Sequence, residues 1–171
     1  MQELAWLRKV IVERALTRGD YVLAGGAASD YYIDKFLLFS DPYVLRRIAR
    51  MFTPIIAELN PDLVGGTELG GVVIATAVSQ MSGIPMIAVR KTPKSYGAFA
   101  NAYVEGPYHH GQRVLLLEDV VTSGTELLAA TQRLQELGLT VTPYAVITRG
   151  LAPVGALIAF SLPRSDPKLE N

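Results

Sequence analysis

Five short apolar runs, separated by helical stretches, constrain the fold of this chain more than any other feature. The runs read DLVGG, PMIAVR, RVLLLED, YAVITR and ALIAFS, and helical patterns lie between them around residues 71–82 and 125–137. Strands that are covered by helices on both faces are apolar throughout, whereas half-exposed strands alternate between apolar and polar residues. The runs therefore predict an α/β fold with a central, mostly parallel sheet flanked by helices.

The first sixty residues predict helices on either side of a less regular segment. Gly19 follows the first apolar stripe, where a glycine commonly ends a helix. Residues 19–34, GDYVLAGGAASDYYID, are more typical of a loop with short extended pieces. A second helix is expected to start at Asp41, and Pro54 should kink or split it. The apolar residues that define the first helix are Leu4, Leu7, Ile11 and Ala15.

Charge and cysteine content exclude several classes of function. Sixteen basic residues balance sixteen acidic ones, so the molecule has no general attraction for nucleic acid or anionic lipid. No stretch reaches the ~18 apolar residues of a membrane span. The chain has no cysteine, which excludes disulfides and thiolate metal sites and suits a reducing compartment. We therefore expect a cytoplasmic protein that binds neither nucleic acid nor membranes.

Residues 114–125, VLLLEDVVTSGT, carry the most specific chemical signal. A buried strand ends in two carboxylates, Glu118 and Asp119, which can accept hydrogen bonds from the hydroxyls of a ribose. A small polar loop then opens a helix, whose free N–H groups can bind a phosphate. The segment predicts a ribose 5-phosphate site, although acids that merely end the strand and cap the helix are the alternative. The predicted binding residues after the acids are Val120, Val121, Thr122, Ser123, Gly124 and Thr125.

This segment resembles the phosphoribosyl pyrophosphate (PRPP) signature of the type I phosphoribosyltransferases. A second motif, RKTPKSYG at Arg90–Gly97, is similar to the catalytic loop of orotate phosphoribosyltransferases, and VEGP at Val104–Pro107 is similar to the end of their lid. The resemblance runs from about Gly19 to Arg149. It implies the type I phosphoribosyltransferase fold, with an N-terminal hood over the base site and a long flexible lid loop, here Lys91 to Gln112.

The resemblance also implies an organisation for the chain. We expect a single phosphoribosyltransferase domain over residues 1–171. Its N-terminal helices and hood would occupy residues 1–60, the core sheet residues 61–161, and a C-terminal tail residues 162–171.

The catalytic loop supplies three cations, Arg90, Lys91 and Lys94. They would neutralise the charge that accumulates on a departing pyrophosphate, with Asp119 as the fourth predicted catalytic residue. Gly97, Ala98 and Ala100 would leave the backbone free to open and close. A solvated basic loop is the alternative interpretation. Tyr96 stands where the family commonly has a histidine, and we assign it to the PRPP site.

For the base, the resemblance points to Tyr32 in the segment ASDYYID, to Thr122 and to Arg149. Tyr32 would stack on orotate, and Arg149 would pair with its carboxylate. Two positions depart from the family pattern. Ala24 stands where many members have a lysine, and Gly70, in a glycine-rich loop at Gly65–Gly71, stands where a basic residue is common.

The implied reaction is displacement of magnesium pyrophosphate from C1 of the ribose by a ring nitrogen of orotate, which gives orotidine 5′-monophosphate. Mg²⁺ would be carried by PRPP, with no direct protein ligand. The family also implies a homodimer in which the lid of one subunit reaches into the active site of its partner. Two alternatives remain: a phosphoribosyltransferase for another base, and a non-catalytic regulator that senses PRPP.

Overall fold

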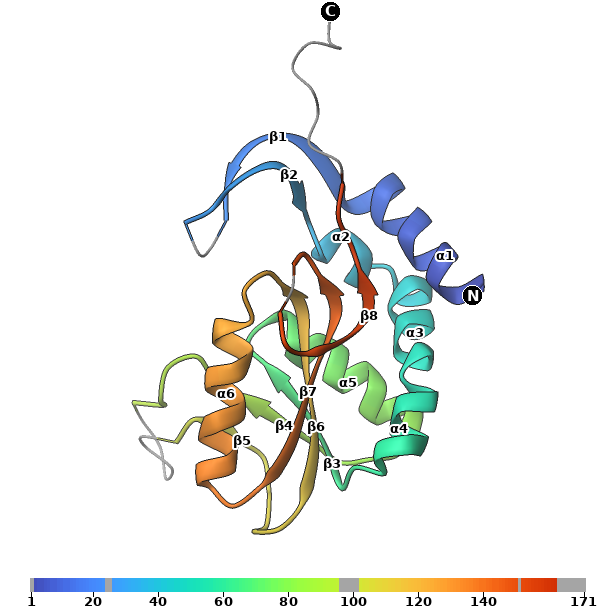
Figure 1. Cartoon of the computed structure of the whole chain (residues 1–171). Helices are drawn as coiled ribbons and strands as arrows, with labels where there is room; N and C mark the ends of the chain where they lie inside the picture. The colour runs from blue at the N-terminus through green and yellow to red at the C-terminus, as the bar shows by residue number, and fades with distance from the viewer. Residues whose placement is uncertain (1, 24–25, 96–101, 151, 163–171) are drawn as a thin grey trace, which may run out of the picture.

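The computed structural model describes residues 2–23, 26–95, 102–150 and 152–162. Within these residues a six-stranded sheet carries helices on both faces, and a separate two-stranded hairpin lies beyond one end of the sheet (Figure 1). The predicted α/β class is confirmed. Several sequence-based predictions fall outside the described residues: those for Ala24, Tyr96, Gly97, Ala98, Ala100 and residues 163–171.

The central sheet has the strand order β5-β4-β3-β6-β7-β8 and is parallel except for β5, which pairs antiparallel with β4. Each of the five predicted apolar runs forms one of its parallel strands. The span from 91 to 112 is not wholly without regular structure, because β5 lies within it. The strands are β3 Leu63–Thr67, β4 Met86–Val89, β5 Val104–Glu105, β6 Arg113–Val121, β7 Thr140–Thr148 and β8 Gly155–Ala159.

Strand β6 shows why these runs are apolar throughout. Leu115 and Leu117 pack into the core beneath α5 (Gly70–Ser82), while Leu116 packs into a second core beneath α6 (Thr125–Glu136). The two helices cover opposite faces of the sheet (Figure 1). Successive strand residues point to opposite faces, so a strand with helices on both sides buries all of them.

The N-terminal segment differs from the prediction in two respects. Helix α1 (Gln2–Val10) continues as a π-helical turn, η1 (Ile11–Ala15), and β1 (Leu16–Val22) then pairs antiparallel with β2 (Ala28–Ile33). This hairpin, called the hood below, is more regular than the loop we expected. Gly19 does not end the helix; it lies in β1 with a φ of 151°, where the strand pairing shifts register. A bulge of this kind favours glycine.

The helices that follow match the sequence signals. After the short α2 (Phe36–Phe39), the Asp41 side chain accepts the backbone N–H groups of Tyr43 and Val44 and caps α3 (Pro42–Met51). Helix α4 (Thr53–Leu59) starts anew with Pro54 in its first turn, so the predicted split is confirmed. In the described part of the chain, none of the helices has the length and apolar content that crossing a bilayer requires.

Candidate active site

A cavity of about 840 Å³ opens at the carboxyl ends of β3 and β6, beside the N-termini of α5 and α6. Four segments line it: the hood and α2, the β3–α5 loop, the start of the lid, and the end of β6 with the loop that follows. Ligands of open α/β sheets bind at this edge. The lining residues are Leu23, Ala27, Lys35, Phe36, Glu68, Leu69, Gly70, Lys91, Thr92, Glu118, Asp119, Val120 and Thr122 to Leu127.

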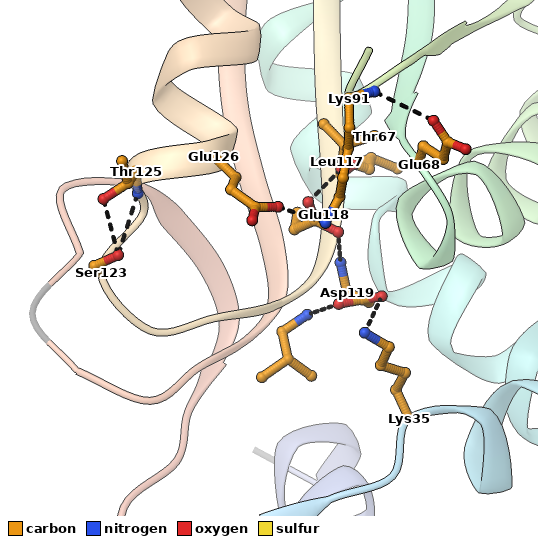
Figure 2. Close-up of polar contacts among 11 residues, drawn as sticks. Lys35, Thr67, Glu68, Lys91, Leu117, Glu118, Asp119, Ser123, Thr125 and Glu126 are labelled. Atoms are coloured by element: carbon orange, nitrogen blue, oxygen red, sulfur yellow. Dashed lines mark hydrogen bonds and ion pairs between the residues drawn. The ribbon is translucent and has the colours of Figure 1, made fainter. Parts of the chain in front are cut away.

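Glu118 lies at the end of β6 and is almost fully buried. Its carboxylate accepts hydrogen bonds from the Thr67 hydroxyl and, at 3.0 Å, from the backbone N–H of Asp119 (Figure 2). Burial, and next the neighbouring Asp119 carboxylate, raise the pKa of Glu118 to about 7. A buried acid held by directed hydrogen bonds at the wall of a cavity is typical of a ligand-binding position.

Asp119 follows directly and is more buried still, with 3% of its surface exposed. Its carboxylate accepts the backbone N–H of Val120, and its Oδ2 lies 3.1 Å from the Nζ atom of Lys35, which reaches across from the start of α2 (Figure 2). The sequence analysis did not identify Lys35. A lysine after an extended segment carries no signal of its direction, and only the tertiary structure brings it to β6.

The polar loop after β6 has the geometry of an anion site. Gly124 caps α6 with a φ of 85°, which glycine adopts without strain. Ser123 and Thr125 are exposed, with their hydroxyl oxygens 3.0 Å apart at the mouth of the cavity. Thr122 and Val120 also line it. Val121 does not: its side chain is buried in the core.

The three predicted lid cations do not converge on this cavity. Lys91 lines it and forms an ion pair with Glu126 of α6 at 2.6 Å. Arg90 and Lys94 instead pair with Glu105 of β5, at 3.5 and 3.2 Å. Arg90 lines an adjacent cavity of about 240 Å³ between β4 and α6. The three cations are therefore held by carboxylates of β5 and α6.

Comparison with known proteins decides the family. Residues 38–154 match the family model of the phosphoribosyl transferase domain. The orotate phosphoribosyltransferase of Thermococcus gammatolerans is 39% identical over 141 residues, which are 81% of this chain and 74% of that protein. This chain belongs to the orotate phosphoribosyltransferase family.

Solved structures of the family share its fold. The orotate phosphoribosyltransferase of Aeropyrum pernix is 29% identical with a TM-score of 0.72, and the match covers 87% of this chain and 83% of that one. The Mycobacterium tuberculosis orotate phosphoribosyltransferase in complex with PRPP is 28% identical with a TM-score of 0.68, over 90% and 85% of the two chains. The predicted type I phosphoribosyltransferase fold is confirmed.

Two of the three residues predicted to bind the base, Arg149 and Tyr32, lie at the hood. Arg149, just after β7, donates to the Ser29 hydroxyl at 2.7 Å and to the Tyr31 carbonyl at 3.2 Å, and it stacks over the Tyr31 ring at 4.0 Å. Tyr32 is 41% exposed and lies against Tyr21. Neither Arg149 nor Tyr32 lines the large cavity, so their contact with a base stays a prediction.

The glycine-rich loop has a packing role that sequence reasoning missed. A side chain at Gly66 would collide with the backbone of Gly71, and one at Gly71 would collide with the carbonyl of Leu117, so these glycines let α5 approach β3 and β6. A side chain at Gly70 would collide with Asp119 Oδ2. The basic residue that is common here in the orotate phosphoribosyltransferase pattern therefore could not replace Gly70 while Asp119 keeps this conformation.

Proposed function

We propose that the protein is an orotate phosphoribosyltransferase, which converts orotate and PRPP to orotidine 5′-monophosphate and pyrophosphate in pyrimidine biosynthesis. One observation carries the proposal: two buried carboxylates, Glu118 and Asp119, share a cavity with the N-terminal loop of α6. The carboxylates suit ribose hydroxyls and the loop suits a 5-phosphate.

The reaction breaks the bond between C1 of the ribose and the pyrophosphate oxygen and forms a bond from C1 to a ring nitrogen of orotate. Positive charge develops on the sugar and negative charge on the leaving pyrophosphate, so no protein nucleophile is needed. Glu118 and Asp119 would hold the ribose by its hydroxyls, and Thr122 to Thr125 would hold the 5-phosphate. Positioning and electrostatic stabilisation then supply the catalysis.

The leaving group would be met by lid cations and by Mg²⁺, which arrives with PRPP as part of the substrate. Magnesium keeps much of its coordination to water and substrate phosphates, which suits this arrangement. Lys91 already lines the cavity. Its ammonium would exchange Glu126 for the pyrophosphate as the substrate binds.

The base would lie between the ribose site and the hood. The Nε–H group of Arg149 is buried and, among the described residues, has no hydrogen-bond partner. A carboxylate could accept from this group and from a second guanidinium nitrogen, in the bidentate arrangement that arginine favours. Tyr32 would contribute an aromatic face.

We also propose a homodimer with shared active sites. Lys94 does not line the cavity of its own subunit, which supports a lid that serves the partner. A cytoplasmic location stays a prediction, for which the absence of cysteine is the sequence support.

An absorbance assay that follows orotate consumption with Mg²⁺ and PRPP tests the proposal. Turnover that requires both PRPP and orotate is the expected result. Uracil, adenine, guanine and hypoxanthine should be tested in parallel, since turnover with one of these alone would assign the enzyme to another base. PRPP binding without turnover of any base would instead indicate a sensor.

A further inference from the structure

Lys35 lies just after the hood and contacts the predicted ribose site. It lies between β2 and α2, and its side chain spans to β6, where Nζ is 3.1 Å from Asp119 Oδ2. The Asp119 side chain is 4% exposed and that of Lys35 is 32% exposed. Both residues line the large cavity. The ion pair is therefore largely shielded from water on the Asp119 side and open to a ligand on the Lys35 side.

The ion pair of Lys35 with Asp119 places a positive charge beside two acidic side chains at the end of β6. Two neighbouring carboxylates, Glu118 and Asp119, are both buried there, and like charges this close disfavour joint ionisation. In the described part of the chain, Lys35 is the one basic side chain that forms an ion pair with either carboxylate. The Lys35 ammonium therefore offsets part of the repulsion between the two carboxylates.

Asp119 is also confined from its other sides. One oxygen accepts the N–H of Val120, and the other lies against Gly70, where no side chain would fit. Lys35 supplies the remaining contact, to the oxygen that faces Gly70. The carboxylate is thus oriented by contacts from β6, from the start of α5 and from Lys35 at the start of α2. Loss of the Lys35 ammonium would remove the contact from the start of α2 to Asp119 Oδ2.

We infer that Lys35 is a positioning residue of the PRPP site, which acts through Asp119 by holding its carboxylate oriented toward the ribose hydroxyls. The inference rests on the proposed function, because it assumes that Asp119 binds the ribose of PRPP. Its sharpest alternative is that Lys35 contacts the phosphates of PRPP itself.

A double-mutant cycle on PRPP binding distinguishes a Lys35 that acts through Asp119 from a Lys35 that contacts the phosphates directly. Dissociation constants would be measured by calorimetry with Mg²⁺ and without a base, for the wild type, Lys35→Met, Asp119→Asn and the double variant. Interacting neighbours show coupling that independent sites lack. Lys35→Met should weaken binding about tenfold in the wild type and less than about twofold in the Asp119→Asn background.

Matched variants complete the test. Lys35→Arg should bind PRPP within about threefold of the wild type, because the guanidinium keeps the ion pair. Lys9→Met removes an exposed lysine that pairs with Glu13 on the first helical segment, and it should leave binding unchanged. Thermal unfolding would establish that each variant is folded. If Lys35→Met is unfolded, Lys35→Gln takes its place in the cycle.

An equal loss of affinity in both backgrounds would overturn the inference in favour of direct phosphate contact. No loss in either background would show that Lys35 has no part in binding. A wild type that does not bind PRPP at all is a different result, which would overturn the proposed function and the inference with it.

Discussion

Glu118 should make the folded protein less stable as the pH rises. Its carboxyl group is buried beside that of Asp119, and these two causes raise its pKa from the usual 4.5 to about 7. A carboxyl group whose pKa is higher in the folded state binds its proton more tightly there than in the unfolded chain. The stability that it contributes is fully present below about pH 4.5 and is lost as the pH rises through about 7.

The size of the effect follows from the two pKa values. Their difference corresponds to at most about 3.4 kcal/mol. A single group with these values removes about 2 kcal/mol of unfolding free energy between roughly pH 5.5 and pH 8.5. For a chain of this length, that loss lowers the melting temperature by about 4–8 °C.

Glu118→Gln removes the titration but keeps an oxygen that can accept from Thr67. Melting temperatures of the wild type and the variant would be measured across this pH range, and the difference between them taken at each pH. We expect the melting temperature of Glu118→Gln, relative to that of the wild type, to rise by about 4–8 °C between roughly pH 5.5 and pH 8.5. Glu13→Gln, at an exposed glutamate of η1, is the control and should show no such trend. Parallel curves for wild type and Glu118→Gln would refute the reasoning.

Three further predictions concern binding and catalysis. Glu126→Gln should lower the KM for PRPP about threefold in steady-state kinetics, because it frees Lys91 from its 2.6 Å ion pair, and an unchanged or raised KM would contradict this. Arg149→Ala should raise the KM for orotate far more than that for PRPP, since only orotate offers a carboxylate; equal effects would count against orotate as the base. Equal amounts of Lys94→Ala and Asp119→Asn, each nearly inactive alone, should recover roughly a quarter of wild-type activity after subunit exchange, because half the dimers would be mixed and each would hold one intact site. Native mass spectrometry would confirm mixed dimers, and their presence without recovered activity would show that the lid serves its own subunit.

The sheet, and the two acids that line the cavity at the end of β6, were predictable from sequence because their signals are local. The apolar run that ends in Glu118 and Asp119 is a strand, two acids and a helix start in one continuous segment, so its order along the chain gives its place in the fold. The cap at Asp41 and the split at Pro54 are local in the same way.

The features that sequence missed depend on contacts between distant segments. The two hood strands contain β-forming residues such as Tyr21, Val22 and Ile33, but polar residues and Gly19 interrupt the alternating pattern, so the pairing of the strands was not evident from sequence. Arg149 meets Ser29 across 120 positions. Neither Glu105, within the VEGP segment, nor Glu126 carries a sequence signal for its ion-pair partner, and only the fold shows that the two acids pair with Arg90, Lys91 and Lys94.

Arg149 has a consequence for how tightly any carboxylate can bind at the hood. In the free protein its guanidinium already donates to Ser29 and Tyr31 and rests on the Tyr31 ring. A ligand that needs the same nitrogens must compete with these internal acceptors. Its apparent affinity is then its intrinsic affinity multiplied by the fraction of molecules in which the guanidinium has been released. Changes at Ser29 would consequently tune the affinity of Arg149 for a carboxylate ligand.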